Sequence, residues 1–185
     1  MESEYLTSEQ IEVALSDVLA SPKERGRLEA IVIRPEPNER EFRTAVHLSP
    51  EAGVEGDRWL TSSGLLLPDG QPDRRAQVSL MNARLLKLIA GSHERMRLAG
   101  DNLIVDFGLG EENIPVGQKL AVGEVLLQVT DLPHTGCRKF SERFGPDALR
   151  FINAAERRSL RLRGLYAQVL KAGTIRIGDA IQKVE

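Results

Sequence analysis

The sequence has a single cysteine among its 185 residues. One thiol excludes an internal disulfide and a four-cysteine metal site. It leaves three roles for this side chain: packing, nucleophilic chemistry, or service as one soft ligand to a bound group. Aromatic residues make up only 4% of the chain, which is too few for a nucleic-acid surface built on base stacking. The net charge of -2 also argues against a general nucleic-acid binder, because such proteins usually carry a basic excess.

Long hydrophobic runs and common cofactor motifs are absent as well. No apolar run approaches the ~20 residues needed to span a bilayer, and the segment Met1–Tyr5 is acidic and polar, unlike a signal or transit peptide. His47, His93 and His134 lack zinc-site spacing, and no glycine-rich nucleotide-binding motif is present. We therefore expect a cytoplasmic protein that has neither a nucleic-acid nor a membrane partner.

The first 25 residues show a helical pattern that differs from the strand patterns in the rest of the chain. Thr7 to Gln10 has the spacing of a capping box, and an apolar stripe at helical period follows it. This predicts an amphipathic helix that ends near Ser21–Pro22 and covers a face or an open end of the fold. A charged linker, Lys23–Arg27, comes next. We accordingly divide the chain into a helix and linker over residues 1–25, packed on the main domain, and the main domain itself over residues 26–185.

The main domain consists of short strand patterns separated by glycine and proline turns. Many short strands with few helices predict a mainly β protein of the β-rich α+β class, in which a closed or strongly curved barrel is flanked by helices. The segment Leu60–Arg75 is expected to be a long, partly apolar loop. The predicted strands are Leu28–Ile33, Thr44–Leu48, Gln77–Leu80, Leu103–Val105, Lys119–Val122, Glu124–Thr130, Tyr166–Leu170, Thr174–Ile177 and Ala180–Val184. The predicted helices run from the cap Asn82 to Ala90, over Arg138–Phe144, and over Asp147–Ala155.

Cys137 lies in a positively charged stretch of the sequence. His134, Arg138, Lys139 and Arg143 are close to it in the chain, and positive charge favours the thiolate over the thiol. A helix over 138–144 would place Cys137 at its amino end, where unpaired N–H groups stabilise an anion. Free cysteines are nevertheless often buried packing residues. The residues alone therefore leave both inert packing and thiol chemistry open.

Two further turns contain polar groups suited to anion binding. In Gly53–Trp59, Asp57 can brace a tight turn and Arg58 offers a planar donor for phosphate or carboxylate. Gly100–Asn102 is a similar polar turn that leads into a strand. Taken alone, segments of this kind are more often plain surface turns.

In their order along the chain, these segments resemble a known family. Over residues 26–185 the sequence is similar to the MOSC domain, the C-terminal module of molybdenum-cofactor sulfurases, which also occurs alone. The segments that carry the resemblance are Leu28–Arg34, Val54–Trp59, Arg75–Met81, Gly100–Val105, Ile114–Leu120, Val122–Glu124, Thr135–Phe140, Arg163–Val169 and Gly173–Asp179.

The resemblance implies a barrel-like fold that binds the molybdenum cofactor or handles its sulfur. The cysteine of the family corresponds to Cys137, which would be a ligand to molybdenum or a carrier of sulfur. A soft thiolate suits both roles. The groups implied to hold the pterin and its phosphate are Arg58, Asn102, Arg138 and Lys139, together with Arg163.

The chain departs from the larger members of the family, and this shapes three hypotheses. It has no room for the pyridoxal-phosphate domain of the sulfurases, and its single cysteine excludes an iron–sulfur domain. A stand-alone module that reduces N-hydroxylated compounds would need an external electron-donor protein. The alternative is a non-catalytic carrier of persulfide sulfur or of the cofactor, which it exchanges with a donor or acceptor enzyme. A third hypothesis is an interaction domain whose Cys137 is merely packed.

Overall fold

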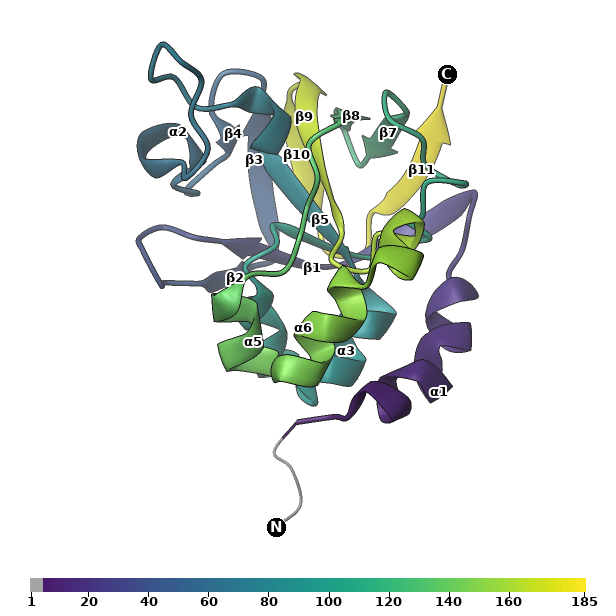
Figure 1. Cartoon of the computed structure of the whole chain (residues 1–185). Coiled ribbons are helices and arrows are strands. Elements are labelled where there is room, and N and C mark those ends of the chain that lie inside the picture. Colours follow the sequence, from purple (N-terminus) through teal and green to yellow (C-terminus); the bar gives the residue numbers. More distant parts are fainter. Residues whose placement is uncertain (1–4) are drawn as a thin grey trace.

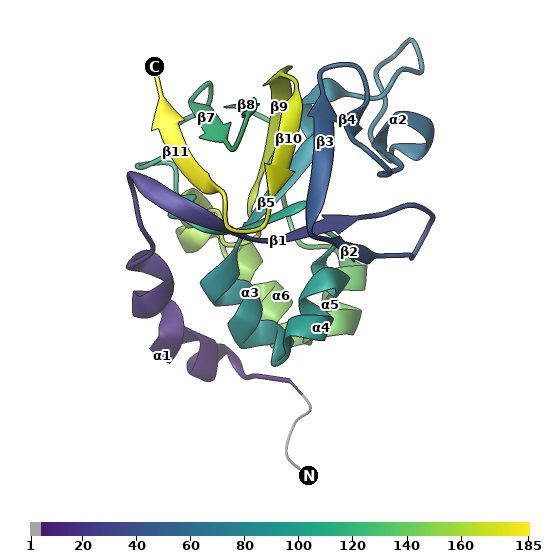
Figure 2. The same cartoon turned by 180° about the vertical axis from the view of Figure 1, so that it is seen from behind.

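The structure is a computed structural model that describes residues 5–185. The expected absence of a leader peptide rests mainly on residues 1–4, which lie outside the described part. Strands form the upper part of the molecule in Figure 1, and most of the helices lie beneath them as a separate layer. The view from behind shows the same two layers (Figure 2). No helix in the described range has the length and apolar character to cross a membrane.

Seven strands in residues 5–185 close into a barrel, which confirms the expected fold class. The strands follow the order β11-β7-β8-β9-β5-β6-β1, and pairing of β11 with β1 closes the ring. The short strand β2 extends β1 outside the ring. The bounds of these strands are β1 Arg25–Ile33, β2 Glu41–Arg43, β5 Val78–Asn82, β6 Leu103–Asp106, β7 Lys119–Val122, β8 Val125–Val129, β9 Leu165–Lys171 and β11 Ala180–Val184.

The odd number of strands accounts for the mixed character of the barrel. Strand direction cannot alternate all the way around a ring of seven, so at least one neighbouring pair must be parallel. That pair is β5–β6, whereas the other six pairs of the ring are antiparallel. Parallel neighbours need a long crossover. Here the crossover contains the helices α3 (Ala83–Ala90) and α4 (His93–Met96), followed by the short helix η2 (Arg97–Ala99).

Alternate residues of the strands serve two separate cores. Leu80, Leu103 and Val105 point into the barrel and belong to its buried cluster. Their neighbours Met81 and Ile104 point outward, into a second buried cluster shared with the helices. Because side chains alternate between the two faces of a strand, both faces of β5 and β6 are apolar. This explains why β6 begins with the continuous apolar run Leu103–Val105 in the sequence.

The helical layer covers the outer face of the barrel. Helix α1 (Ser8–Leu19) starts with the predicted capping box, in which Thr7 and Gln10 satisfy each other's backbone N–H groups. Its buried residues Ile11 and Val18 join the second core, and α1 packs against α3 and α6. The remaining elements of this layer are α5 (Arg138–Phe144), α6 (Pro146–Asn153) and η3 (Ala155–Leu160).

Some elements are not anticipated by the sequence pattern. The strands β2 and β4 (Gly53–Val54) are too short to show periodicity, and β4 joins β3 (Ala45–Ser49) and β10 (Gly173–Arg176) in a small second sheet. The predicted loop Leu60–Arg75 overlaps the helical turn α2 (Trp59–Ser62) and the short helix η1 (Arg74–Ala76). Trp59 is buried and its ring N–H donates to the carbonyl of Asp73, 3.3 Å away, so this side chain ties the two ends of the segment together.

Candidate functional site

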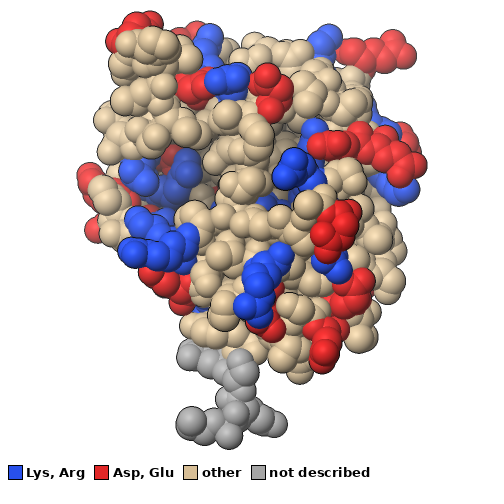
Figure 3. All heavy atoms as spheres, viewed as in Figure 1, with Lys and Arg blue, Asp and Glu red and all other residues tan. Residues whose placement is uncertain are grey.

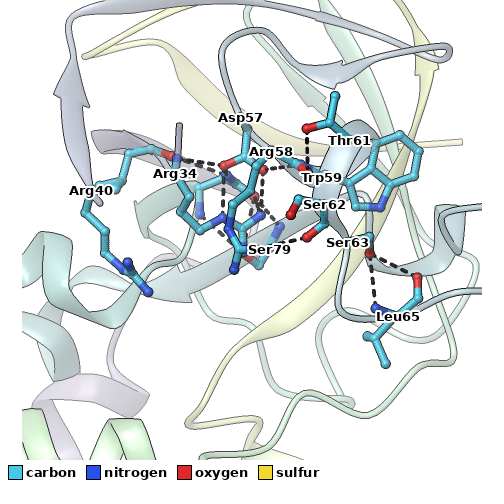
Figure 4. A network of polar contacts seen from close by, with 12 residues as sticks. Arg34, Arg40, Asp57, Arg58, Trp59, Thr61, Ser62, Ser63, Leu65 and Ser79 are labelled. Carbon is cyan, nitrogen blue, oxygen red and sulfur yellow. Dashed lines mark hydrogen bonds and ion pairs between the residues drawn. The ribbon is translucent and has the colours of Figure 1, made fainter. Parts of the chain in front are cut away.

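A buried ion pair lies at the end of β1. The backbone N–H and Nε of Arg34 both donate to Oδ1 of Asp57, at 2.8 and 2.9 Å, and Nη2 donates to Oδ2 at 2.8 Å. The Asp57 side chain is fully buried. Burial alone would lower the pKa of Arg34, but the hydrogen bond and the charge of Asp57 outweigh it and raise the pKa. Figure 4 shows this pair with the neighbouring Arg58. The carboxylate therefore fixes both the backbone and the guanidinium of Arg34.

Asn102 joins this pair to the barrel. Its amide nitrogen donates to the carbonyl of Val32 and to Oδ1 of Asp57, both at 3.2 Å. Its amide oxygen accepts from the backbone N–H of Ser79 at 3.1 Å. Asn102 is fully buried, so it connects β1, β5 and the start of β6 with the turn that carries Asp57. Its polar atoms are satisfied within the protein, an arrangement that braces Arg34.

Arg40 is an arginine with a surplus of positive charge around it. Its pKa is lowered to about 10, first by burial and then by the charges of Arg143, Arg34 and Arg58. Its Nε is buried without a hydrogen-bond partner among the described residues. In Figure 4 the Arg40 side chain lies to the left of Arg34 and Arg58, with its guanidinium turned toward the helices. We call these four residues the arginine cluster; a bound anion would relieve their repulsion and satisfy the free donor.

The space-filling view shows the same concentration of charge from outside. Lysine and arginine atoms gather at the left of the face in Figure 3, level with the boundary between the barrel and the helical layer.

Cys137 is an exposed residue on a fixed turn. It is the N-cap of α5, and its carbonyl accepts from the backbone N–H groups of Phe140 and Ser141, at 2.9 and 3.2 Å. The residue before it is also held, because the Asn153 side chain bonds both the N–H and the carbonyl of Gly136 at 2.9 and 3.0 Å. The alternative of a packed thiol is therefore wrong. In this part of α5 the buried side chain is that of Phe140 and not that of the cysteine.

Two contacts place Cys137 in the same neighbourhood as the arginine cluster. Lys139 donates through Nζ to Oδ1 of Asn38 at 3.2 Å, which links α5 to the loop between Arg34 and Arg40. The pKa of Tyr166 is raised, first by burial and then by Asp101, with Cys137 adding a smaller effect in the same direction. Arg34 acts on the same hydroxyl in the opposite direction. The thiol, the phenol and the guanidinium thus share one electrostatic environment.

Arg163 and Arg138, both expected to bind the cofactor, lie in contrasting surroundings. Arg163 is buried, forms an ion pair with Asp101 through Nη1, and donates through Nη2 to the carbonyl of Ala99 at 3.2 Å. Its guanidinium lies over the Phe140 ring, 5.1 Å from the ring centre. Arg163 therefore packs against the buried face of α5. Arg138 is 90% exposed and pairs with Glu142 at 3.1 Å on the helix surface.

The structure therefore brings together Cys137, Lys139, Arg58 and the brace Asn102, and it adds residues that the sequence does not single out. Arg34 and Arg40 are ordinary arginines in the sequence with no local pattern to distinguish them, and Arg143 stands out there only as one of the positive residues near Cys137. Asp57 was recognised only as a brace for its own turn. Tyr166 was counted only as the start of a strand. None of these roles has a local signal, because each depends on a contact between distant segments.

A cavity of about 420 Å³ is lined by residues 130–135, the segment that leads to Cys137. His134 is one of its lining residues, while Cys137 and the arginine cluster are not. Among the described residues, no group of three or more His, Cys, Asp or Glu side chains is arranged to hold a metal ion. A metal at this site would therefore have fewer than three such side chains as ligands, and Cys137 is the exposed soft donor beside the cluster.

Comparisons with known proteins agree with this architecture. The sequence model of the MOSC domain matches residues 43–182. The barrel also requires β1, which precedes that range and pairs with β11. No curated protein sequence matches the chain.

Solved structures with the same fold come from several bacteria. The YUAD protein of Bacillus subtilis is 17% identical, with a TM-score of 0.61, over 86% of this chain and 95% of that one. YiiM from Geobacillus stearothermophilus is 18% identical, with a TM-score of 0.59, over 86% of this chain and 75% of that one. YiiM from Escherichia coli is 20% identical, with a TM-score of 0.54, over 86% and 70%. At this level of identity the likeness concerns the fold.

Proposed function

Because this chain belongs to the MOSC domain family, which is associated with molybdenum-cofactor binding, we propose that it binds the molybdenum cofactor between Cys137 and the arginine cluster. The observation that supports this most directly is the buried, unpartnered Nε of Arg40 among like charges. Such a group gains from an anion. The phosphate of the pterin is an anion that guanidinium groups bind well.

The residues fit the two ends of such a cofactor. Arg40, Arg58 and Lys139 would hold the phosphate, while Arg34 is kept in place by Asp57 and Asn102. Cys137, exposed on its fixed turn, would provide the soft thiolate ligand to the metal. Arg138, which is free to swing in from the surface, and the buried Arg163 are weaker candidates for direct contact. A reducing cytoplasm would keep the sulfur of Cys137 in the reduced state that this role needs.

With the cofactor bound, the metal would supply two-electron chemistry at an N–O bond. An N-hydroxylated amine would take up two electrons and two protons and give the amine and water. The electrons would come from a separate electron-donor protein. The part of this chain is to bind and orient the cofactor, and the raised pKa of Tyr166 keeps that hydroxyl protonated beside the thiol.

A non-catalytic carrier is the second candidate, and the exposure of Cys137 favours it. An exposed thiol can accept a sulfane sulfur and pass it to an acceptor enzyme without any redox partner. A cyanide-labile sulfur on the purified protein would indicate this role. A permanent metal ligand should carry none.

The ligand assignment is tested by Cys137→Ser in a host that makes the cofactor. We expect this variant to fold normally and to lose at least tenfold in bound molybdenum, measured by elemental analysis alongside pterin. Arg40→Ala should lose both metal and pterin. Arg43→Ala is a matched control, because Arg43 is exposed and pairs with Glu41 outside the cluster. Full metal content in Cys137→Ser would refute the ligand role of the cysteine.

A further inference from the structure

The cavity beside His134 has the size and lining of a site for a small molecule. Its volume of about 420 Å³ falls in the range of ligand sites, about 300–1,000 Å³. Apolar side chains form much of its wall, with polar groups at a few points. The apolar lining residues that matter below are Leu132, Ile152, Leu162 and Leu165.

His134 is the buried polar group of this cavity. Its side chain is only 7% exposed, and Nδ1 lies 3.6 Å from Oδ1 of Asp101. Neither atom has a hydrogen-bond partner in the described chain, and 3.6 Å is too long for a hydrogen bond between the two. One face of the imidazole is covered by the Tyr166 ring, with 4.2 Å between centroids. The ring is therefore held in one orientation, with a single neighbour for Nδ1.

The neighbour of Nδ1 fixes the tautomer of His134. Burial raises the pKa of Asp101, and the charges of Arg163 and Arg34 act against that rise. The ion pair that its other oxygen forms with Arg163 favours the carboxylate, which can only accept a hydrogen bond. Burial and the nearby arginines lower the pKa of His134 well below its usual value, which keeps the ring neutral. The single proton of a neutral ring then belongs on Nδ1, facing Asp101. Nε2, at the far edge of the ring, is left with a lone pair.

Charges near the cavity give no preference for an ionic ligand. Glu111, Asp131, Arg158, Arg161 and Arg163 line it. Arg163 is neutralised by its ion pair with the buried Asp101, which leaves two charges of each sign. Arg161 is already engaged with backbone carbonyls, including that of Ile114. The acceptor atom Nε2 of His134 therefore determines which polar group of a ligand the site prefers.

We propose that this cavity binds a small, flat, uncharged and mostly apolar molecule through an N–H or O–H group that donates to Nε2 of His134. The site is separate from the cofactor-binding face and does not need molybdenum. It shares with that face the segment that ends at Cys137 and the buried Arg163, a weaker candidate for cofactor contact. Such a molecule would lie directly behind the residue proposed to hold the metal.

The test uses two probes that differ by one hydrogen-bond donor. Indole carries an N–H, and 1-methylindole has nearly the same shape without it. Both would be titrated into the full chain, purified free of molybdenum, while the methyl signals of Leu132, Ile152, Leu162 and Leu165 are followed by NMR. We expect saturable shifts at these methyls and at least tenfold weaker binding of 1-methylindole. No saturable shift at these methyls, or equal affinities, would overturn the proposal.

Variants identify the acceptor. His134→Phe keeps an aromatic ring against Tyr166 but removes the lone pair, so the difference between the two probes should disappear. His93→Phe is the matched control, since His93 stacks on Phe42 at 4.7 Å in another part of the helical layer, and it should discriminate as the parent does. A folded His134→Phe protein that still prefers indole would also refute the proposal. The outcome is independent of cofactor binding, because no probe contains metal or pterin.

Discussion

Two carboxylate side chains beside the proposed cofactor site are almost fully buried, and each is paired with one arginine. Asp57 holds Arg34 and Asp101 holds Arg163, with side-chain exposures of 0% and 1% for the acids. Buried ion pairs contribute little net stability, but removing one partner leaves an uncompensated charge. Both pairs lie beside the proposed cofactor site. Their role at the scale of single residues is therefore to fix the orientation of side chains.

At the same scale, His134 makes stability depend on pH. Its folded-state pKa lies well below the usual value, whereas the unfolded chain should protonate it near about 6.5. Below that pH the unfolded state binds a proton that the native state does not, so the free energy of unfolding falls as pH falls. We expect His134→Phe to remove about 1 kcal/mol of the stability loss between pH 7.5 and 5.5, as measured by urea denaturation at both values. His47→Gln, a change at an exposed histidine, should leave the loss unchanged. An unaltered pH profile in His134→Phe would contradict the buried neutral ring.

At the scale of elements, the first helix is part of the packed structure. Ile11 is fully buried against the helical layer, while Val13 on the same helix is 83% exposed. We expect Ile11→Ala to lower the free energy of unfolding by about 2–4 kcal/mol, because it leaves a cavity between helices. Val13→Ala should change it by less than about 0.5 kcal/mol. Denaturant unfolding measures both. Equal effects of the two changes would mean that the helix does not pack as described.

At the scale of the whole molecule, the seam between β1 and β11 decides whether the barrel closes. Gly26 pairs with Ile181 across this seam, and a Cβ at Gly26 would overlap the carbonyl oxygen of Asp106 and the side chain of Phe107. Gly26→Ala is therefore expected to destabilise the protein by about 2–3 kcal/mol. Gly64→Ala, where a Cβ meets nothing within 4 Å, is the control and should be close to neutral. Thermal unfolding of the two variants provides the comparison, and a tolerated Gly26→Ala would argue against this close approach.

The sequence by itself determined the elements and the thiol. Periodicity, caps and glycine turns predicted the strands of the barrel, and the cap Asn82 and the helix over 138–144 are found as expected. These features are local, because a strand or a cap is recorded within a few neighbouring residues. The local helix pattern over residues 138–144 also predicted that Cys137 lies at the start of a helix.

Only the tertiary structure decided which side chains surround that thiol. The arginine cluster combines Arg34 and Arg40 from one loop, Arg58 from a second turn and Arg143 from the helix that follows Cys137. Their grouping depends on barrel closure and on the path of the loops. Whether a polar residue binds a ligand or braces a neighbour also depends on contacts across the fold. Asn102, predicted to contact the cofactor, is occupied with Asp57 and Ser79. The local sequence determines which face of a helix or strand is buried. The residue that a side chain meets across the barrel depends on how the barrel closes, and no short segment of sequence determines that closure.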